Sequence, residues 1–320
     1  MDNDVFPVAY AAYNKNNNIR KESTSGGVFT VIAGYLIEYR NAVVYGAAFD
    51  NEFNVKHIRV ESKEELNKLR GSKYPQSQVA ECFKLAKEDL ELNRTVLFVG
   101  TPCQIVGLKN FLKKEFENLY TMDFVCHGVA SDLVWRDFVS YLSRKGKIQN
   151  ITFKYKFKGW KKWYFRVDYE QGFWQRRGHM TKFMNSYLSY ANIRPSCYEC
   201  SFKGVNRNSD FTISDCWGIA ESDKEINDNL GLSALLIQND KALKLFKLIS
   251  ERLVTKRYDA KELMEGNWTT FKCVPRPAIR EKFFKEVENT SGDVALNKYF
   301  TPTVKQWIVY YYQKLRGKEK

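Results

Sequence analysis

The sequence predicts an α/β (α+β) protein with a mixed sheet that has a parallel strand–helix–strand core, an antiparallel middle portion and a helical C-terminal region. Three observations lead to this class. A strand–helix–strand pattern fills residues 95–128, alternating apolar and polar residues follow residue 150, and basic helical patterns dominate from about residue 260. We place soft boundaries that give portions 1–148, 149–240 and 241–320, and these can also form one compact domain.

The first third alternates between turn, helix and strand patterns. The stretch "SGGVFTVIAGYLIEYR" (25–40) predicts a Gly-Gly turn that opens a helix, and "AVVYGAAF" (42–49) predicts a buried strand. "KHIRV" (56–60) predicts a second strand. Ser62 and Glu65 then have the spacing of a capping box, which predicts the start of another helix.

The clearest α/β unit lies between residues 95 and 128. "TVLFVG" (95–100) is a buried strand, "IVGLKNFLKKEF" (105–116) an amphipathic helix, and "LYTMDFVCHG" (119–128) the next strand. A unit of this length implies neighbouring parallel strands. The turns that carry Cys103 and Cys126 would then lie at the carboxyl ends of these strands, where open α/β sheets bind ligands.

The pattern changes after residue 150. "ITFKYKFKGW" (151–160) and "WYFRVDYEQG" (163–172) alternate as antiparallel strands. A helix at 182–193 leads into the Cys-x-x-Cys stretch "RPSCYECSFKG" (194–204). The further elements that we expect are strands at 209–219 and 232–239 and a helix at 241–253.

Composition limits the class of protein and its location. The 320 residues are 44% hydrophobic and 15% aromatic, which suits a globular chain with a substantial core. No apolar run reaches the roughly 18 residues that span a bilayer. The N-terminus "MDNDVFPVAY" lacks the basic-then-apolar layout of a signal peptide, so we expect a cytoplasmic protein.

The chain is basic, with a net charge of +14 and a pI near 9.3. Such a balance can serve nucleic acid, an anionic membrane surface or phosphate-bearing ligands. The charge is scattered over residues 158–163, 175–180 and 314–320, and no nucleic-acid-binding motif is present. We therefore expect no specific nucleic-acid binding; a solvated basic face, peripheral contact with an anionic inner membrane face and a pocket for an anionic cofactor stay open.

Four of the seven cysteines could bring their thiolates to one point: Cys103, Cys126, Cys197 and Cys200. An odd number of cysteines without a secretion signal argues against a disulfide framework. Zinc and a 4Fe–4S cluster both take four thiolates. Structural zinc usually uses two close pairs, and only one is present, which favours a cluster. A redox dithiol at the Cys-x-x-Cys pair and unrelated buried thiols stay as alternatives.

The other three cysteines have different surroundings. Cys82, in "VAECFKLAK", is expected on a helix as a small buried residue. Cys273, in "FKCVP", has no neighbour that indicates a ligand. Cys216, in "SDCWG", stays open as a substitute ligand, and we expect its deletion to leave a cluster in place.

Two turns carry groups that suit a phosphorylated cofactor, although each can also be an ordinary cap or surface loop. "STSGGVFT" (23–30) opens a helix with glycines that allow close approach to an anion. "LRGSKYPQS" (69–77) combines basic, hydroxyl and aromatic side chains. Thr101 opens the helix after a strand and could cap it or contact a ligand. His127, one of three histidines, is either a hydrogen-bonded structural group or a donor to a reduced flavin or a substrate carbonyl.

With these residues in place, the sequence resembles the beta-subunit family of coenzyme F420 hydrogenases and dehydrogenases. The resemblance covers roughly residues 20 to 240. The stretches that carry it are "STSGGVFT", "LRGSKYPQS", "LFVGTPCQIVGLKNFL", "DFVCHG", "RPSCYECSFK" and "SDFTISDCWGI". The short form seen here is similar to family members encoded beside surface-polysaccharide biosynthesis enzymes.

The resemblance implies an FAD-binding α/β protein with one 4Fe–4S cluster close to the flavin. In the family, the flavin exchanges hydride with a deazaflavin and single electrons with the cluster. Cluster ligation would fall on Cys103, Cys126, Cys197 and Cys200. The flavin contacts would fall on Ser25, Gly26, Gly27, Ser72, Lys73, Tyr74 and Thr101, and His127 is the candidate catalytic residue.

Two departures from the family pattern affect these expectations. The sequence begins after the point where the ferredoxin-like segment of many members would end, so we expect either a separate ferredoxin-like protein as electron partner or such a segment ahead of this sequence. The usual "GDxWG" reads "SDCWG", with Ser214 in place of the first glycine. The expected function is an iron–sulfur flavoprotein oxidoreductase with a small-molecule substrate; a zinc-stabilised accessory or scaffold protein in glycan assembly is the alternative. A homo-oligomer is compatible with either.

Overall fold

The computed structural model describes residues 5–315, which form two compact units. The first unit contains residues 5–73, 77–127 and 200–273, and the second contains 74–76, 128–199 and 274–315. Each unit therefore combines three separate stretches of the chain. The predicted boundaries near 148 and 240 mark changes in the sequence pattern, and they stay a prediction. Of the basic tail at 314–320, residues 316–320 lie outside the described part.

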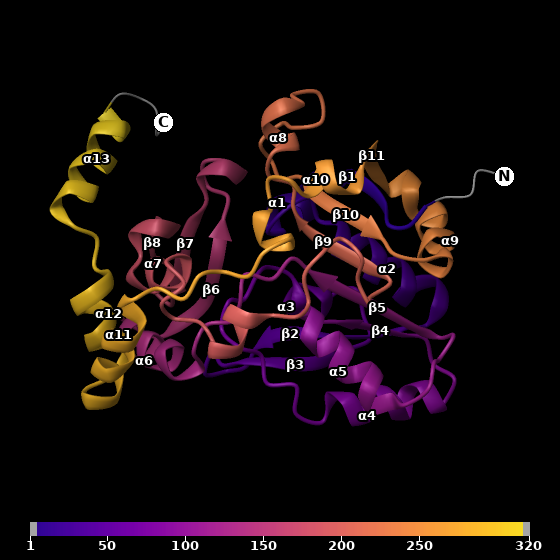
Figure 1. The fold of residues 1–320 in the computed structure, drawn as a ribbon, viewed down its shortest axis with the longest axis horizontal. Helices are drawn as coiled ribbons and strands as arrows, with labels where there is room; N and C mark the ends of the chain where they lie inside the picture. Colours follow the sequence, from indigo (N-terminus) through magenta and orange to yellow (C-terminus); the bar gives the residue numbers. More distant parts are fainter. Residues whose placement is uncertain (1–4, 316–320) are drawn as a thin grey trace. The chain divides into compact units, whose positions relative to one another are not determined.

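The first unit is built on a mixed sheet, which has eight strands within the described residues. These are β1 (Val8–Asn14), β2 (Val43–Phe49), β3 (Val55–Val60), β4 (Val96–Val99), β5 (Leu119–Phe124), β9 (Phe211–Asp215), β10 (Ser233–Ile237) and β11 (Leu253–Tyr258). Their order across the sheet is β11-β1-β10-β9-β5-β4-β2-β3, and Figure 1 shows it from top to bottom of this unit. The pairs β2–β4, β4–β5 and β5–β9 are parallel, and the others are antiparallel.

Helices cover both faces of this sheet, because successive residues of its central strands point to opposite sides. Val44 and Leu97 pack with α2, α3 and α9, whereas their neighbours Val43 and Phe98 pack with α4 and α5. The strands are therefore buried on both faces, which explains their nearly continuous apolar runs. The helices of the unit are α1 (Asn17–Glu22), α2 (Val28–Arg40), α3 (Leu66–Leu69), α4 (Cys82–Glu91), α5 (Pro102–Leu112), α8 (Ile219–Ser222), α9 (Asp240–Ile249) and α10 (Ala260–Met264), with 3₁₀ turns η4 (Ser250–Arg252) and η5 (Trp268–Thr270).

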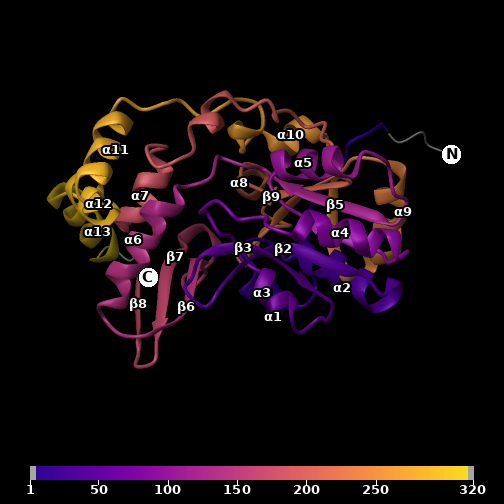
Figure 2. The ribbon, with the colours of Figure 1, turned by 90° about the horizontal axis from the view of Figure 1, so that it is seen from below.

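The second unit packs a small antiparallel sheet against helices, as Figure 2 shows. Its sheet has the order β6-β7-β8. The elements are β6 (Ile148–Tyr155), β7 (Tyr164–Tyr169), β8 (Phe173–Arg177), α6 (Asp132–Ser143), α7 (Lys182–Leu188), α11 (Ile279–Asn289), α12 (Gly292–Phe300), α13 (Val304–Leu315), η1 (Trp160–Lys162), η2 (Gly178–Met180) and η3 (Pro195–Glu199). The core is aromatic: Trp135, Phe138, Phe153, Phe165 and Phe183 are buried and lie in ring contact with one another.

The predicted fold class is confirmed, with a parallel core, an antiparallel middle portion and C-terminal helices. Several predicted helix limits were wrong. The helix expected at 105–116 spans Pro102–Leu112, because Thr101 caps its start and Lys113 adopts φ 59° at its end. The helix expected to reach 193 ends at Leu188, and the chain then turns through Tyr190 with φ 62°. The helix expected to reach 253 ends at Ile249, since Leu253 begins the edge strand β11. Within residues 5–315, every helix is too short or too polar to cross a membrane.

The aromatic core of the second unit predicts a difference between two phenylalanines. Phe165 is fully buried, so we expect Phe165→Ala to lower the free energy of unfolding by about 3–5 kcal/mol. Phe173, which is 56% exposed, is the matched control, and Phe173→Ala should cost less than about 1 kcal/mol. Urea denaturation followed by tryptophan fluorescence measures both; equal losses would contradict the packing described.

Candidate functional site

The residues predicted to bind cofactors in the first unit follow strands that run in one direction. The parallel pairs align β2, β4, β5 and β9, and β1 shares their direction because two antiparallel pairings connect it to β9 through β10. The chain leaves β1, β4 and β5 for the stretches 23–27, 101–103 and 126–127. The carboxyl ends of these strands form one edge of the sheet, which is where open α/β sheets bind ligands.

The loop at 25–27 lies tightly against β1 and β10. Ser25 Oγ donates to Leu232 O at 2.5 Å, and Gly26 N donates to Ser233 Oγ at 2.9 Å. A Cβ at Gly26 would lie 2.4 Å from Ala12 O, so only glycine fits there. Gly27 caps α2 with φ 80°, and the start of that helix has no side-chain cap. The N–H group of Gly26 is thus already used, whereas the α2 N-terminus keeps its capacity to attract an anion.

The second predicted loop, at 69–77, contacts the first. Thr24 Oγ1 accepts hydrogen bonds from Ser72 N at 2.7 Å and Ser72 Oγ at 3.0 Å. Arg70 donates to Thr30 Oγ1 at 3.3 Å and pairs with Glu22. The two stretches that the sequence indicated as phosphate-binding loops therefore meet in the folded unit, although they lie 48 positions apart.

Lys73 has an unusual environment for a lysine. Its ammonium group donates to the carbonyl oxygens of Leu69, Arg70 and Gly71 at 3.1–3.3 Å. Burial lowers the pKa of Lys73 to about 7. An ammonium held among carbonyl groups without a carboxylate partner is a position where a ligand anion would be stabilised.

Tyr74 belongs to the second unit. Its ring lies 5.1 Å from Phe153 and 4.6 Å from Tyr187, measured between ring centroids, and its carbonyl accepts from Ala130 N at 2.9 Å. The ring therefore contributes to the aromatic core of that unit, and its predicted contact with a flavin stays a prediction.

The start of α5 holds Thr101 and Cys103 together. Thr101 and Gln104 form a capping box, in which Gln104 Oε1 accepts from Thr101 N at 2.9 Å. The Thr101 hydroxyl lies 3.0 Å from Cys103 Sγ, and the Cys103 side chain is exposed. Gln104 Nε2 donates to Ser77 O at 3.4 Å, which ties this helix start to the 69–77 loop.

His57 is a buried residue at this edge that the sequence analysis did not single out. Its two ring nitrogens lie 2.7 Å from Ser77 Oγ and 3.0 Å from Val99 O, and its ring stacks on Phe98. Burial lowers its pKa to about 4, so the ring is neutral near pH 7. It positions the 69–77 loop against the end of β4. His57 stands as a single histidine in the predicted strand "KHIRV", and this pattern does not indicate such a role.

The end of β5 carries Asp123, and the segment after the strand carries Cys126 and His127. Cys126 and His127 are half-buried, and Cys126 O accepts from Lys203 Nζ at 3.3 Å. Asp123 is buried, its Oδ1 atom has no hydrogen-bond partner in the described residues, and burial raises its pKa to about 6. Asp123 begins the stretch "DFVCHG", but the sequence analysis gave it no role, because its burial depends on the pairing of β5 with β9.

The Cys-x-x-Cys pair spans the passage from the second unit to the first. Cys197, in η3 of the second unit, is half-buried, and its Cβ would lie 3.2 Å from a Cβ placed on Gly128. Gly128 follows Cys126 by two positions, so the "CHG" stretch and the Cys-x-x-Cys stretch meet at this contact inside the second unit. Cys200 is half-buried in the first unit, and its carbonyl accepts from Cys273 Sγ at 3.3 Å.

Two of the remaining cysteines, Cys82 and Cys216, are buried, and for Cys82 the sequence predicted this. Cys82 is buried in α4 and donates to His57 O at 3.3 Å. Cys216 is fully buried, and burial raises the pKa of its thiol to about 12. A thiol with so high a pKa is a poor ligand, because metals bind the thiolate.

The four proposed cluster ligands are of the donor type that a 4Fe–4S cluster takes, but they do not form a preassembled group in the described residues. All four side chains are at least partly accessible, whereas Cys82 and Cys216 are buried. In the part of the chain that the structure describes, no three histidine, cysteine, aspartate or glutamate side chains converge into a metal-binding group. Three of the four cysteines belong to the first unit and Cys197 to the second. The structure thus brings the two loops predicted to bind phosphate together, and the predicted cluster set rests on donor chemistry alone.

Comparison with known proteins identifies the family. Residues 9–84 match the N-terminal family of the coenzyme F420 hydrogenase/dehydrogenase beta subunit, and residues 93–261 match the family described as the C terminus of the same beta subunit. The chain belongs to this family. Membership assigns the beta-subunit-like chain to redox proteins, with an oxidoreductase or electron-transfer role.

A solved structure has the same fold. The chain resembles one from the F420-reducing [NiFe] hydrogenase complex of Methanosarcina barkeri, with a TM-score of 0.53 and 16% identity. The match covers 83% of this chain and 91% of the other. No curated protein sequence matches significantly.

The raised pKa of Asp123 predicts a specific pH dependence. The folded state binds this proton more tightly than the unfolded chain, whose carboxyl has a pKa near 4. The associated stabilisation is full below about pH 4 and is lost as the pH rises through about 6. We expect Asp123→Asn to abolish this loss. The free energy of unfolding of the variant should therefore rise relative to that of the native protein by up to about 3 kcal/mol between pH 4 and pH 7.

Urea denaturation at several pH values measures this difference. Asp50 is the control of opposite sign, because hydrogen bonds from Lys56 and Asn54 outweigh its burial and lower its pKa. Asp50→Asn should therefore lose stability relative to the native protein as the pH rises from 3 to 5. A pH-independent effect of Asp123→Asn would contradict the assignment.

Proposed function

We propose that this protein is an iron–sulfur flavoprotein oxidoreductase. It would move electrons between a 4Fe–4S cluster, FAD and a small organic substrate that accepts or donates hydride, of which the family's F420-type deazaflavin is the model. One observation carries the proposal: the two family segments, 9–84 and 93–261, contain every residue predicted to hold either cofactor. We propose that the protein works in the cytoplasm and in polysaccharide biosynthesis.

The flavin site is proposed at the carboxyl edge of the sheet of the first unit. When bound there, FAD supplies hydride chemistry that no side chain provides. The uncapped start of α2 at Gly27 and the ammonium of Lys73 would attract its diphosphate, and the Thr24–Ser72 hydrogen bonds hold these two groups together. Ser25, Gly26, Tyr74 and Thr101 stay in the proposed contact set, with Gly26 acting by letting the loop approach β1.

The cluster ligands are proposed to be Cys103, Cys126, Cys197 and Cys200. All four side chains are at least partly accessible. The Thr101 hydroxyl lies 3.0 Å from Cys103 Sγ and can donate to its thiolate, which stabilises the charged form that a cluster requires. His127, directly after Cys126, is proposed to donate a hydrogen bond or a proton to the flavin or the substrate.

A protein partner would complete the electron path. The structurally similar chain comes from a hydrogenase complex, which supports association with other proteins. We propose a separate ferredoxin-like protein as the donor or acceptor of single electrons. A homo-oligomer and peripheral contact with an anionic membrane are compatible with this assignment.

The cofactors give the first test. We expect protein purified without oxygen to show flavin absorption bands and a broad cluster shoulder near roughly 400 nm, with about four iron atoms and one FAD per chain. Optical spectroscopy and elemental analysis measure this. A colourless protein that contains zinc would overturn the assignment in favour of an accessory or scaffold role.

The ligand set predicts different iron contents for different cysteine variants. Cys197→Ala should abolish iron incorporation, because it removes a thiolate ligand. Cys82→Ala and Cys216→Ala should retain iron, since both thiols are buried and neither belongs to the proposed ligand set. Iron analysis of the three variants after anaerobic purification decides the point. Equal iron in Cys197→Ala and Cys82→Ala would refute the ligand set.

The flavin site predicts a selective loss of FAD. Lys73→Met should lower FAD affinity at least tenfold, because it removes the cation proposed to face the diphosphate. Lys63→Met is the matched control, since Lys63 is exposed and pairs with Glu38. Flavin fluorescence after gel filtration and iron analysis measure the two cofactors separately. Retained FAD in Lys73→Met would place the diphosphate elsewhere.

A further inference from the structure

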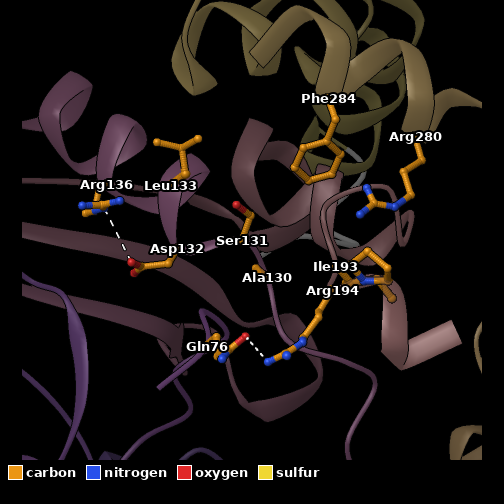
Figure 3. Close-up of a pocket in the computed structure, with 11 residues that line it drawn as sticks. Gln76, Ala130, Ser131, Asp132, Leu133, Arg136, Ile193, Arg194, Arg280 and Phe284 are labelled. Atoms are coloured by element: carbon orange, nitrogen blue, oxygen red, sulfur yellow. Dashed lines mark hydrogen bonds and ion pairs between the residues drawn. The ribbon is translucent and has the colours of Figure 1, made fainter. Parts of the chain in front are cut away.

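The second unit contains a cavity of about 310 Å³ at the start of α6. Its walls come from the first turn of α6, the segment at 193–195, Gln76 and the helix α11 (Figure 3). All these residues belong to the second unit. Its volume is at the lower end of the range found for small-molecule sites.

Arg280 is the unusual residue of this cavity. Its side chain is buried, with 7% exposed, and its guanidinium forms no hydrogen bond or ion pair with the described residues. Figure 3 shows this group directed from α11 toward the start of α6. It lies 4.2 Å from the ring centroid of Phe284 and 5.7 Å from that of Tyr198.

These ring contacts do not balance the burial of the charge. A cation–π contact offsets only part of the desolvation of a charged group. Burial of a charged group is costly unless the group is paired and hydrogen-bonded. A buried arginine whose Nε atom has no hydrogen-bond partner in the described residues is therefore suited to an anion that binds beside it.

The groups around Arg280 also favour an anion. The cavity includes the N-terminal end of α6, a helix of 12 residues with Ser131 as its cap, and the helix dipole favours negative charge there. Arg136 and Arg194 also line the cavity. Arg194 is exposed and donates to Gln76 Oε1 at 3.1 Å, so it can turn toward a ligand at low cost. Arginine matches the geometry of phosphate oxygens particularly well.

Asp132 adds a requirement for the rest of the ligand. Its carboxylate lines the cavity, and Oδ2 lies 3.6 Å from Arg136 Nε. Its Oδ1 atom is buried without a hydrogen-bond partner in the described chain. An acceptor of this kind is satisfied by a hydroxyl group and repels a second anion. The cavity is also larger than a phosphate ion needs.

We propose that this cavity binds a small phosphate ester that carries hydroxyl groups. Arg280 and the α6 N-terminus bind the phosphate, Arg194 closes on it from the rim, and Asp132 accepts from a hydroxyl. This site goes beyond the proposed redox function and does not depend on it.

Calorimetric titration of the native protein, with its cofactors and in phosphate-free buffer, tests the proposal. The probes are glycerol 3-phosphate, inorganic phosphate and glycerol. We expect glycerol 3-phosphate to bind, inorganic phosphate to bind more weakly, and glycerol not to bind. Arg280→Met should weaken glycerol 3-phosphate binding tenfold or more, because it removes charge-assisted hydrogen bonds. The free variant should melt no lower than the native protein, since a buried unpaired charge is removed.

Arg144→Met is the matched control and should bind as the native protein does, because Arg144 is 68% exposed and lies outside the cavity lining. Arg194→Gln, at the rim, gives a second variant that reports on the site if Arg280→Met folds poorly. Absence of binding to the native protein, or equal affinity in Arg280→Met and Arg144→Met, overturns the proposal. Loss of FAD from Arg280→Met would assign the cavity to the flavin and also overturn it.

Discussion

The parallel pairing of β5 with β9 is the constraint on which the first unit depends. It joins β11, β1, β10 and β9 to β5, β4, β2 and β3 in one sheet. Asp210 fixes the pairing: its Oδ2 accepts from Thr121 N at 2.7 Å and from Thr121 Oγ1 at 2.8 Å, while Asn239 donates to Oδ1 at 2.9 Å. Since Asp210 and Thr121 are 89 positions apart, these bonds set the register between distant parts of the chain.

This register determines which chemical groups share an edge. With Asp123 opposite Thr212, the segments that follow β5 and β9 leave the sheet on the same side, as do those that follow β1 and β4. The two loops predicted to bind phosphate, Cys103, Cys126 and the neutral ring of His57 are thereby gathered from separate stretches of sequence. The edge combines a cation without a carboxylate partner, at Lys73, with the uncapped start of α2, and this combination suits a cofactor that carries both phosphate and redox chemistry.

Sequence patterns predicted the elements that depend on local order. The β4–α5–β5 unit, the glycine-opened helix α2 and the carboxyl-end positions of Cys103 and Cys126 all follow from short motifs. Burial and pairing across long distances could not be predicted in this way. The strand β1 was missed because its burial comes from β10 and β11, and Asp123 and Arg280 look like ordinary charged residues until the fold encloses them. The assembly of the four cluster cysteines also depends on more than one stretch, and it stays a proposal.

The central claim is that the accessible cysteines hold an iron–sulfur cluster beside the flavin edge. The most direct measurement is anomalous X-ray diffraction at the iron absorption edge, on crystals of protein prepared without oxygen. The account predicts a single strong iron peak bonded to the Sγ atoms of Cys103, Cys126, Cys197 and Cys200. Absence of iron at these sulfur atoms, or a signal only at the zinc edge, would contradict it.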